Sequence, residues 1–145
     1  MGDLAKDINS KFDNEHVKAL INIKYTSSYL DNIANKILKP HNISEQQYNI
    51  LRILRGAGKE ITVNTVKKRM IQKSPNSTRL MDKLCDKNLI NRVRCESDRR
   101  VVYVEISKDG LELLDKINLK ELDKYTRGLT VNEARTLNKL LDKIR

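Results

Sequence analysis

The sequence has few of the residues that build aromatic cores, disulfide frameworks or β-sandwiches. Aromatic residues make up 4% of its 145 residues, with no Trp and a single Phe, and there are two Cys, two Pro and five Gly. This scarcity of aromatic and turn residues disfavours a β-sandwich and favours helices with an Ile, Leu and Val core. A chain of this length can bury about 70% of its unfolded surface. It therefore needs neither a disulfide nor a metal to fold.

Long apolar runs are also absent. The longest is residues 101–104, whereas a helix that crosses a bilayer needs about 20 apolar residues. Residues 1–12 lack the apolar stretch of a signal peptide, and Lys6 stands where the myristoylation pattern has Ser or Thr. We therefore expect a cytoplasmic protein with no membrane partner.

Groups for catalysis or metal binding are few. The chain has two His, and Cys85 and Cys95 lie ten residues apart without neighbouring His ligands. Gly56 and Gly58 lack the spacing of a phosphate-binding loop, so a helix terminator is the better interpretation. Cys85 is expected to be a buried apolar residue, and Cys95 a partly exposed residue without a redox role. We expect no enzyme activity, no metal and no cofactor.

Positive charge is abundant and concentrated in the middle of the chain. The formal net charge is +10, and residues 62–104 hold eleven Lys and Arg against four Asp and Glu. Seven of the ten excess positive charges therefore lie in this segment. Such an excess indicates a polyanionic partner, either nucleic acid or a membrane surface.

Apolar residues at helical spacing predict helices over 14–38, from Ser44 to about 55, over 62–70, 74–88, 107–127 and from Thr130 onward. Capping boxes at Ser44 and Thr130, Thr62 as a cap, and Ser74 followed by Pro75 mark four of the starts. Asn88 is expected to close its helix in the left-handed conformation. Two strands, 89–95 and 101–106, follow this helix, with a charged connection over 96–100. The predicted fold is mainly α (α+β), a winged helix-turn-helix with a two-stranded wing.

This order of elements suits duplex DNA. A helix can enter the major groove, where base edges present a distinct donor and acceptor pattern, and a hairpin with an Arg at its tip can reach the minor groove. The start of the 74–88 helix is expected to expose the short polar side chains and the Arg of residues 76–79 to phosphates and base edges. The predicted contacts on this helix are Asn76, Ser77, Thr78, Arg79 and Lys83.

Residues 77–110 resemble the signature of the MarR family of bacterial transcription regulators. The matching points are S-T-R-L-x-D-x-L in the helix, Leu-Ile-x-Arg where the wing begins, Asp-Arg-Arg at its tip and V-x-I-S-x-x-G after it. The resemblance implies one domain over 1–145, with a DNA-binding part at about 44–106 and dimerisation helices at about 14–38 and 107–145. It also implies a homodimeric repressor on a pseudo-palindromic operator, responsive to a small phenolic or lipophilic effector.

The resemblance assigns roles to the wing residues. Arg100 corresponds to the minor-groove arginine, and Asp98 to the carboxylate that orients the wing arginines Arg99 and Arg100. Two positions depart from the family pattern. Asn88 stands where the family usually has Gly, but Asn can adopt the same backbone conformation. Lys67 stands near a position where the family usually has Ala, so we expect looser packing there unless the aliphatic part of the Lys67 side chain reaches out to solvent.

Other interpretations stay open at this point. Ser77 and Thr78 could serve as helix caps or hydrated surface rather than DNA contacts. The apolar stripes of the flanking helices could pack on one another within one chain. We favour the alternative, in which they form the interface of a dimer. The fold could also serve as a scaffold for an acidic protein partner, or as a sequence-indifferent nucleic-acid binder.

Overall fold

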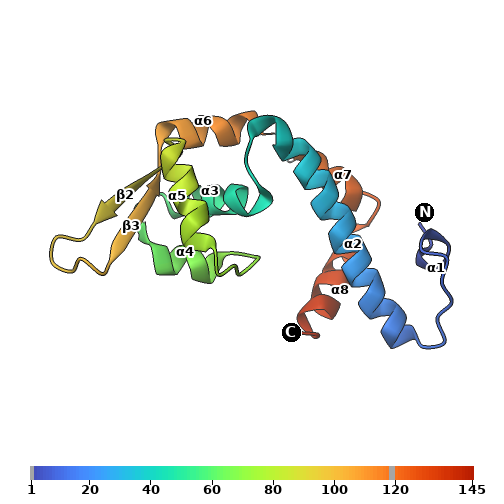
Figure 1. Ribbon diagram of the computed structural model, residues 1–145. Helices are drawn as coiled ribbons and strands as arrows, with labels where there is room; N and C mark the ends of the chain where they lie inside the picture. The colour runs from blue at the N-terminus through green and yellow to red at the C-terminus, as the bar shows by residue number, and fades with distance from the viewer. Residues whose placement is uncertain (1, 118–119) are drawn as a thin grey trace.

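The computed structural model describes residues 2–117 and 120–145 and is rich in helices (Figure 1). The helices are α1 Leu4–Asp7, α2 Glu15–Leu38, the short 3₁₀ helix η1 Lys39–His41, α3 Glu45–Ala57, α4 Val63–Arg69, α5 Ser77–Asp86, α6 Lys108–Lys116, α7 Lys120–Thr126 and α8 Val131–Asp142. The strands are β1 Ile61–Thr62, β2 Ile90–Arg94 and β3 Val102–Ile106. All pairings are antiparallel, in the order β1-β3-β2. The predicted class and wing are confirmed, while α1 and β1 were not predicted.

Local capping chemistry places several helices where the sequence predicts them. The Ser44 hydroxyl accepts the Gln47 N–H, and the Gln47 side chain accepts the Ser44 N–H, each at 3.1 Å. Thr62 caps α4, and a second capping box pairs Thr130 with Glu133 at the start of α8. Hydrogen bonds from Thr130 lower the pKa of Glu133. Asn88 has φ +57°, as expected for the residue that closes α5.

The start of α5 differs from the prediction. The helix begins at Ser77 rather than at Ser74, and its N-cap Asn76 makes no side-chain cap. The Ser74 hydroxyl accepts the N–H of Asn76 at 3.1 Å, and the Ser74 carbonyl accepts the N–H of Ser77 at 3.2 Å. These bonds close a separate turn before the helix, because Ser side chains stabilise turns as readily as helix starts.

The single helix predicted over 107–127 is wrong. Its first part, α6, ends at Lys116, and Ile117 has an extended backbone with φ −83° and ψ 112°. Leu114 and Ile117 are both buried in the core, so their spacing fits a helix whether it continues or stops. Periodicity alone could not detect this break. Leu119 lies outside the described residues, as does the side chain of Leu122.

The hydrophobic core lies in one lobe formed by α3–α6 and the sheet. Its fully buried side chains include Leu38, Ile50, Leu51, Leu54, Val66, Met81, Leu84, Ile90 and Val104. Of α2, only Ala34 and Leu38 are buried, and α8 has no buried residue. Figure 1 shows α2, α7 and α8 on the opposite side of the molecule from the wing. Tyr29 of α2 and Tyr125 of α7 meet edge to face, 5.8 Å between ring centroids.

Within residues 2–117 and 120–145, no helix combines the length and apolar character that a bilayer crossing requires.

Gly110, in the first turn of α6, permits a close approach to the backbone at the end of α5. A Cβ at this position would lie 2.3 Å from the Leu89 carbonyl oxygen and 2.7 Å from the Ile106 Cγ1. We expect Gly110→Ala to lower the free energy of unfolding by about 1–3 kcal/mol, as overpacked positions do. Gly56→Ala is the matched control, because no atom lies within 4 Å of its added Cβ.

For Gly56→Ala in α3 we expect a gain of up to about 1 kcal/mol from helix propensity. Urea denaturation of the two variants measures both values. Equal effects of the same sign would contradict the close packing at Gly110.

Candidate nucleic-acid interface

Helix α5 is fixed by its apolar face and exposes its polar one. Met81 and Leu84 are fully buried against the core, whereas Thr78, Arg79 and Lys83 are exposed. Asn76, the residue before the helix, is also exposed. Four of the five predicted contacts on this helix therefore lie on an accessible surface.

Ser77 does not lie on that surface. Its side chain faces the C-terminal end of α4, and the residue is only 2% exposed. The expectation that Ser77 belongs to the exposed side is wrong, because α5 starts later than predicted and its first residue then turns toward α4.

The tip of the wing exposes its arginines by means of a hydrogen-bonded turn. Residues 96–100 are all exposed, and the Val101 N–H donates to the Asp98 carbonyl at 3.0 Å. The Asp98 carboxylate accepts the backbone N–H of Arg100 at 2.9 Å. In the described part of the chain, no ion pair joins Asp98 to the Arg99 or Arg100 guanidinium. Asp98 therefore fixes the turn that carries the arginines, and its orientation of their guanidinium groups stays a prediction.

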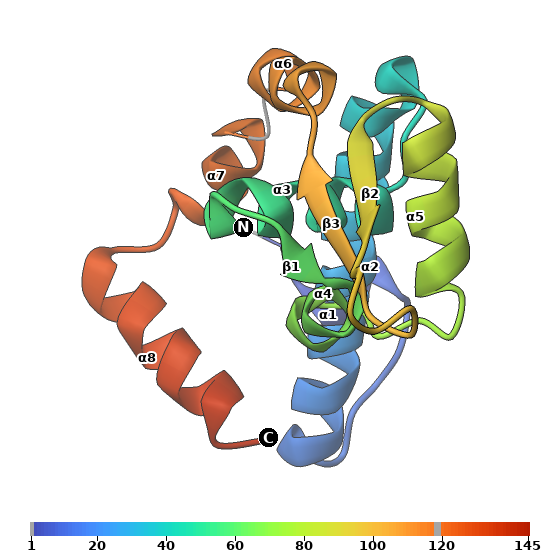
Figure 2. The same cartoon turned by 90° about the vertical axis from the view of Figure 1, so that its left-hand side faces the viewer.

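An ion pair connects α5 to the base of the wing. Asp82 of α5 lies 2.6 Å from the Arg92 guanidinium of β2. Both views show α5 beside β2, with the wing projecting away from the core (Figures 1 and 2). Arg94 follows Arg92 by two positions, so it lies on the same face of the strand, further toward the tip. Arg92 and Arg94 were not among the predicted site residues, although an alternating Arg-x-Arg strand next to a basic tip indicates them.

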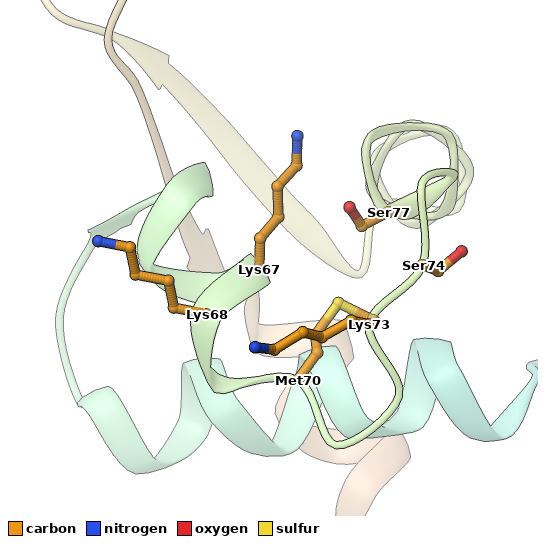
Figure 3. A pocket seen from close by; sticks show the side chains of 6 residues that line it. All are labelled: Lys67, Lys68, Met70, Lys73, Ser74 and Ser77. Atoms are coloured by element: carbon orange, nitrogen blue, oxygen red, sulfur yellow. The ribbon is translucent and has the colours of Figure 1, made fainter.

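A pocket with several basic residues lies between α4 and the start of α5. Its volume is about 230 Å³, and Figure 3 shows the side chains around it. It is lined by Lys67, Lys68, Met70, Lys73, Ser74 and Ser77. The three lysines were not among the predicted contacts, because sequence spacing alone does not show that the α4–α5 turn forms an open pocket.

The two cysteines have different environments. Burial raises the pKa of the Cys85 thiol, which packs against the core. A hydrogen bond with the Ser97 hydroxyl, 3.0 Å from the Cys95 Sγ, lowers the pKa of Cys95. Over the described ranges, no group of three His, Cys, Asp or Glu residues is arranged to hold a metal ion.

Comparison with known proteins supports a regulator of transcription. The family model described as transcriptional regulator SarA/Rot matches residues 32–117, more than half of the chain. The multiple antibiotic resistance protein MarR of Salmonella typhimurium is 31% identical over 118 residues, covering 79% of this chain and 81% of the relative.

Solved structures agree with the sequence comparison. A mutant MarR of Escherichia coli complexed with operator DNA has a TM-score of 0.79 at 27% identity, covering 93% of this chain and 99% of that one. The organohalide-sensing regulator RdhR, in its 2,4-dichlorophenol-bound form, has a TM-score of 0.80 at 20% identity, covering 93% and 81%, and shows the fold alone. A chain with this winged lobe, this family match and this relative belongs to the MarR family of transcriptional regulators.

Proposed function

We propose that this regulator binds duplex DNA as a homodimer, with α5 in the major groove and the wing tip in the adjacent minor groove. The observation that carries this proposal is that α5 and the wing lie side by side: Met81 and Leu84 of α5 and Ile90 of β2 pack in one core, and Asp82 pairs with Arg92 at 2.6 Å. The exposed side of α5 and the arginine-bearing tip then form one interface. The operator-bound MarR of Escherichia coli supports the proposal, since it has the same fold.

The contacts divide into two groups by chemistry. Arg79 has the planar guanidinium that grips a guanine edge, with Asn76, Thr78 and Lys83 beside it for bases or phosphates. Arg99 and Arg100 supply the positive charge that the narrow minor groove attracts. The α5 group specifies sequence, and the wing group adds affinity.

The homodimer is supported by apolar surface that the single chain leaves uncovered. Helix α8 has no buried residue, although it carries several large apolar side chains. Leu140 is 55% exposed, and Ile144, just beyond the helix, is 67% exposed. Val17, Leu20 and Ile23 of α2 are also exposed. Surfaces of this kind mark interfaces. A two-fold dimer through these helices sets its recognition helices one DNA turn apart, roughly 34–36 Å.

We further propose that the protein is a repressor released by a small phenolic or lipophilic effector. The structure of RdhR with 2,4-dichlorophenol supports this class of ligand. An effector that binds the dimer better when its recognition helices are wrongly spaced shifts the population away from DNA. The effector therefore acts by changing the distance between the two α5 helices of the dimer, rather than by blocking the DNA-binding surface of α5.

A gel-shift experiment tests the proposed function against its alternatives. The probe is the DNA upstream of the protein's own coding region, with and without roughly a 50-fold excess of nonspecific competitor. We expect a shift that survives the competitor. Loss of the shift under competitor would indicate a sequence-indifferent binder, and no shift at all would indicate a scaffold for protein partners.

Removing one wing arginine is expected to weaken binding and its salt dependence together. We expect Arg100→Ala to flatten the plot of log affinity against log salt by about 0.9 per protomer, since one charge near a phosphate is lost. Fluorescence anisotropy at several salt concentrations measures this slope. Unchanged affinity and slope would rule out the role of Arg100.

A pair of variants separates the two roles considered for Asp98. Asp98→Asn and Asp98→Ala remove the same charge, but only Asn keeps an oxygen that can accept the Arg100 N–H. We expect Asn to bind DNA more tightly than Ala by about 0.5–1.5 kcal/mol, the value of one hydrogen bond. Equal weakening by both would show instead that the carboxylate charge matters, as an ion pair with a wing arginine requires.

A further inference from the structure

The pocket between α4 and α5 has a size that suits one small charged group. Its volume is about 230 Å³, whereas a cavity needs only about 10–15 Å³ of such space to hold one water molecule. A phosphate group with part of its ester chain therefore fits. Met70 is buried at its base, and every other lining side chain carries an amino or hydroxyl group.

The charge around the pocket is entirely positive. Lys67, Lys68 and Lys73 contribute amino groups, and no acidic residue lines the pocket. In the described part of the chain, none of the three lysines forms an ion pair. Their charges are therefore available to an anion.

Ser77 provides an independent indication of a ligand. Its residue is 2% exposed, and its hydroxyl makes no hydrogen bond among the described residues. Among the described residues, every fully enclosed polar side-chain atom has a hydrogen-bond partner. The unpartnered Ser77 hydroxyl is therefore not fully enclosed, and its small accessible surface faces the pocket that it lines. Figure 3 shows this oxygen on the side of α5 that faces Lys67, whereas the Ser74 hydroxyl points the other way. A hydroxyl that lines the pocket and has no protein partner is free to hydrogen-bond a ligand there.

Lys67 places a cation at the pocket. It occupies a position in α4 where its neighbour Val66 is fully buried and where a small residue is expected, yet it is only half-buried. Its amino group stands at the pocket rather than in the core (Figure 3). The departure from the expected small residue therefore adds a cation beside the Ser77 hydroxyl.

We infer that this pocket is a phosphate site that takes one backbone phosphate of the bound duplex, held by Lys67, Lys73 and the Ser77 hydroxyl. The inference rests on the proposed function. Ser77 is the first residue of α5, so the positive end of the helix dipole lies beside the pocket. A phosphate held there fixes how far the first turn of α5 enters the groove, so the site sets the register of Arg79 on the bases.

Single neutral linkages in the DNA test the inference. The probe is the shortest duplex that the wild-type protein binds in preference to competitor, with a methylphosphonate replacing one phosphate at a time. The variants are Lys67→Ala, Ser77→Ala and the rescue variant Lys67→Arg. Lys108→Gln is the charge-matched control, because α6 lies on the opposite side of the lobe from α4 in both views (Figures 1 and 2).

We expect Lys67→Ala to weaken binding about tenfold or more per protomer, as loss of a charge-assisted hydrogen bond does. At one phosphate per half-site, the methylphosphonate should weaken the wild type and Lys108→Gln fully, but Lys67→Ala and Ser77→Ala clearly less, because each variant has already lost one of the contacts to that phosphate. Lys67→Arg should restore the sensitivity. This non-additivity identifies a shared contact.

Each other outcome overturns the inference in a recognisable way. Additive effects at every phosphate, in variants that melt like the wild type, would show that no phosphate sits in the pocket. An NMR titration in which inorganic phosphate binds at Ser77 without competing with the duplex would assign the site to a free phosphate instead. If the wild type shows no preference for any duplex, the proposed function itself fails, before the pocket is tested.

Discussion

The double substitution Leu137→Asp and Leu140→Asp is expected to convert the protein to monomers and to abolish most of its operator affinity. The two residues lie one turn apart on α8 and are 45% and 55% exposed in the single chain. Two Asp side chains on this face would have to be buried in the dimer, where unpaired charges are strongly disfavoured. Losing the second half-site should lower operator affinity by about 10²- to 10⁴-fold. Analytical ultracentrifugation and gel shifts measure the two effects.

The control adds the same charge to a different face of the helix. Asn132→Asp and Asn138→Asp lie on exposed polar positions of α8 and should leave a dimer with operator affinity near that of the wild type. Circular dichroism of both double variants checks that the helices remain. A Leu137/Leu140 variant that stays dimeric and binds normally would show that α8 is not at the interface.

Arg79→Ala is expected to remove sequence discrimination at one base pair in each half-site. A bidentate contact to guanine accounts for about 1–3 kcal/mol of discrimination, which is about 5- to 150-fold in affinity per protomer. Affinity for nonspecific DNA should change far less. Competition between the operator and single-base variants measures the ratio.

Arg79→Lys separates base recognition from charge. Lysine keeps the positive charge but not the planar pair of donors, so discrimination should fall while the salt dependence of binding stays the same. If Arg79→Ala weakens binding equally on all sequences, and Arg79→Lys restores it, then Arg79 is a phosphate contact rather than a base contact.

The sequence predicted those features that depend on short-range rules. The cap at Ser44 and the left-handed Asn88 follow from residue types within three or four positions, and each is confirmed. The wing was predicted from the alternation of residues 101–106, and it forms where expected. The two-residue strand β1 was missed because nothing in Ile61–Thr62 itself indicates pairing with Val104 and Tyr103.

Features that depend on the direction of a single side chain could not be predicted. Helix α5 begins about one turn later than predicted, and Ser77 is buried, whereas it was expected at the surface. The Asp98 carboxylate accepts the backbone N–H of Arg100, a partner that the motif did not specify. A motif identifies which residues act together, whereas the hydrogen-bond partner depends on backbone geometry that spacing does not specify.

Methylation protection by dimethyl sulfate tests the central claim most directly, because it reports guanine N7 in the major groove and adenine N3 in the minor groove at once. We expect protected guanine N7 in two segments about one helical turn apart, with protected adenine N3 in the minor groove next to each. In the double variant Arg99→Ala and Arg100→Ala, the adenine protection should disappear while the guanine protection remains. Adenine protection that persists in this variant, or a wild-type footprint confined to one groove, would contradict the pairing of α5 and the wing on one duplex.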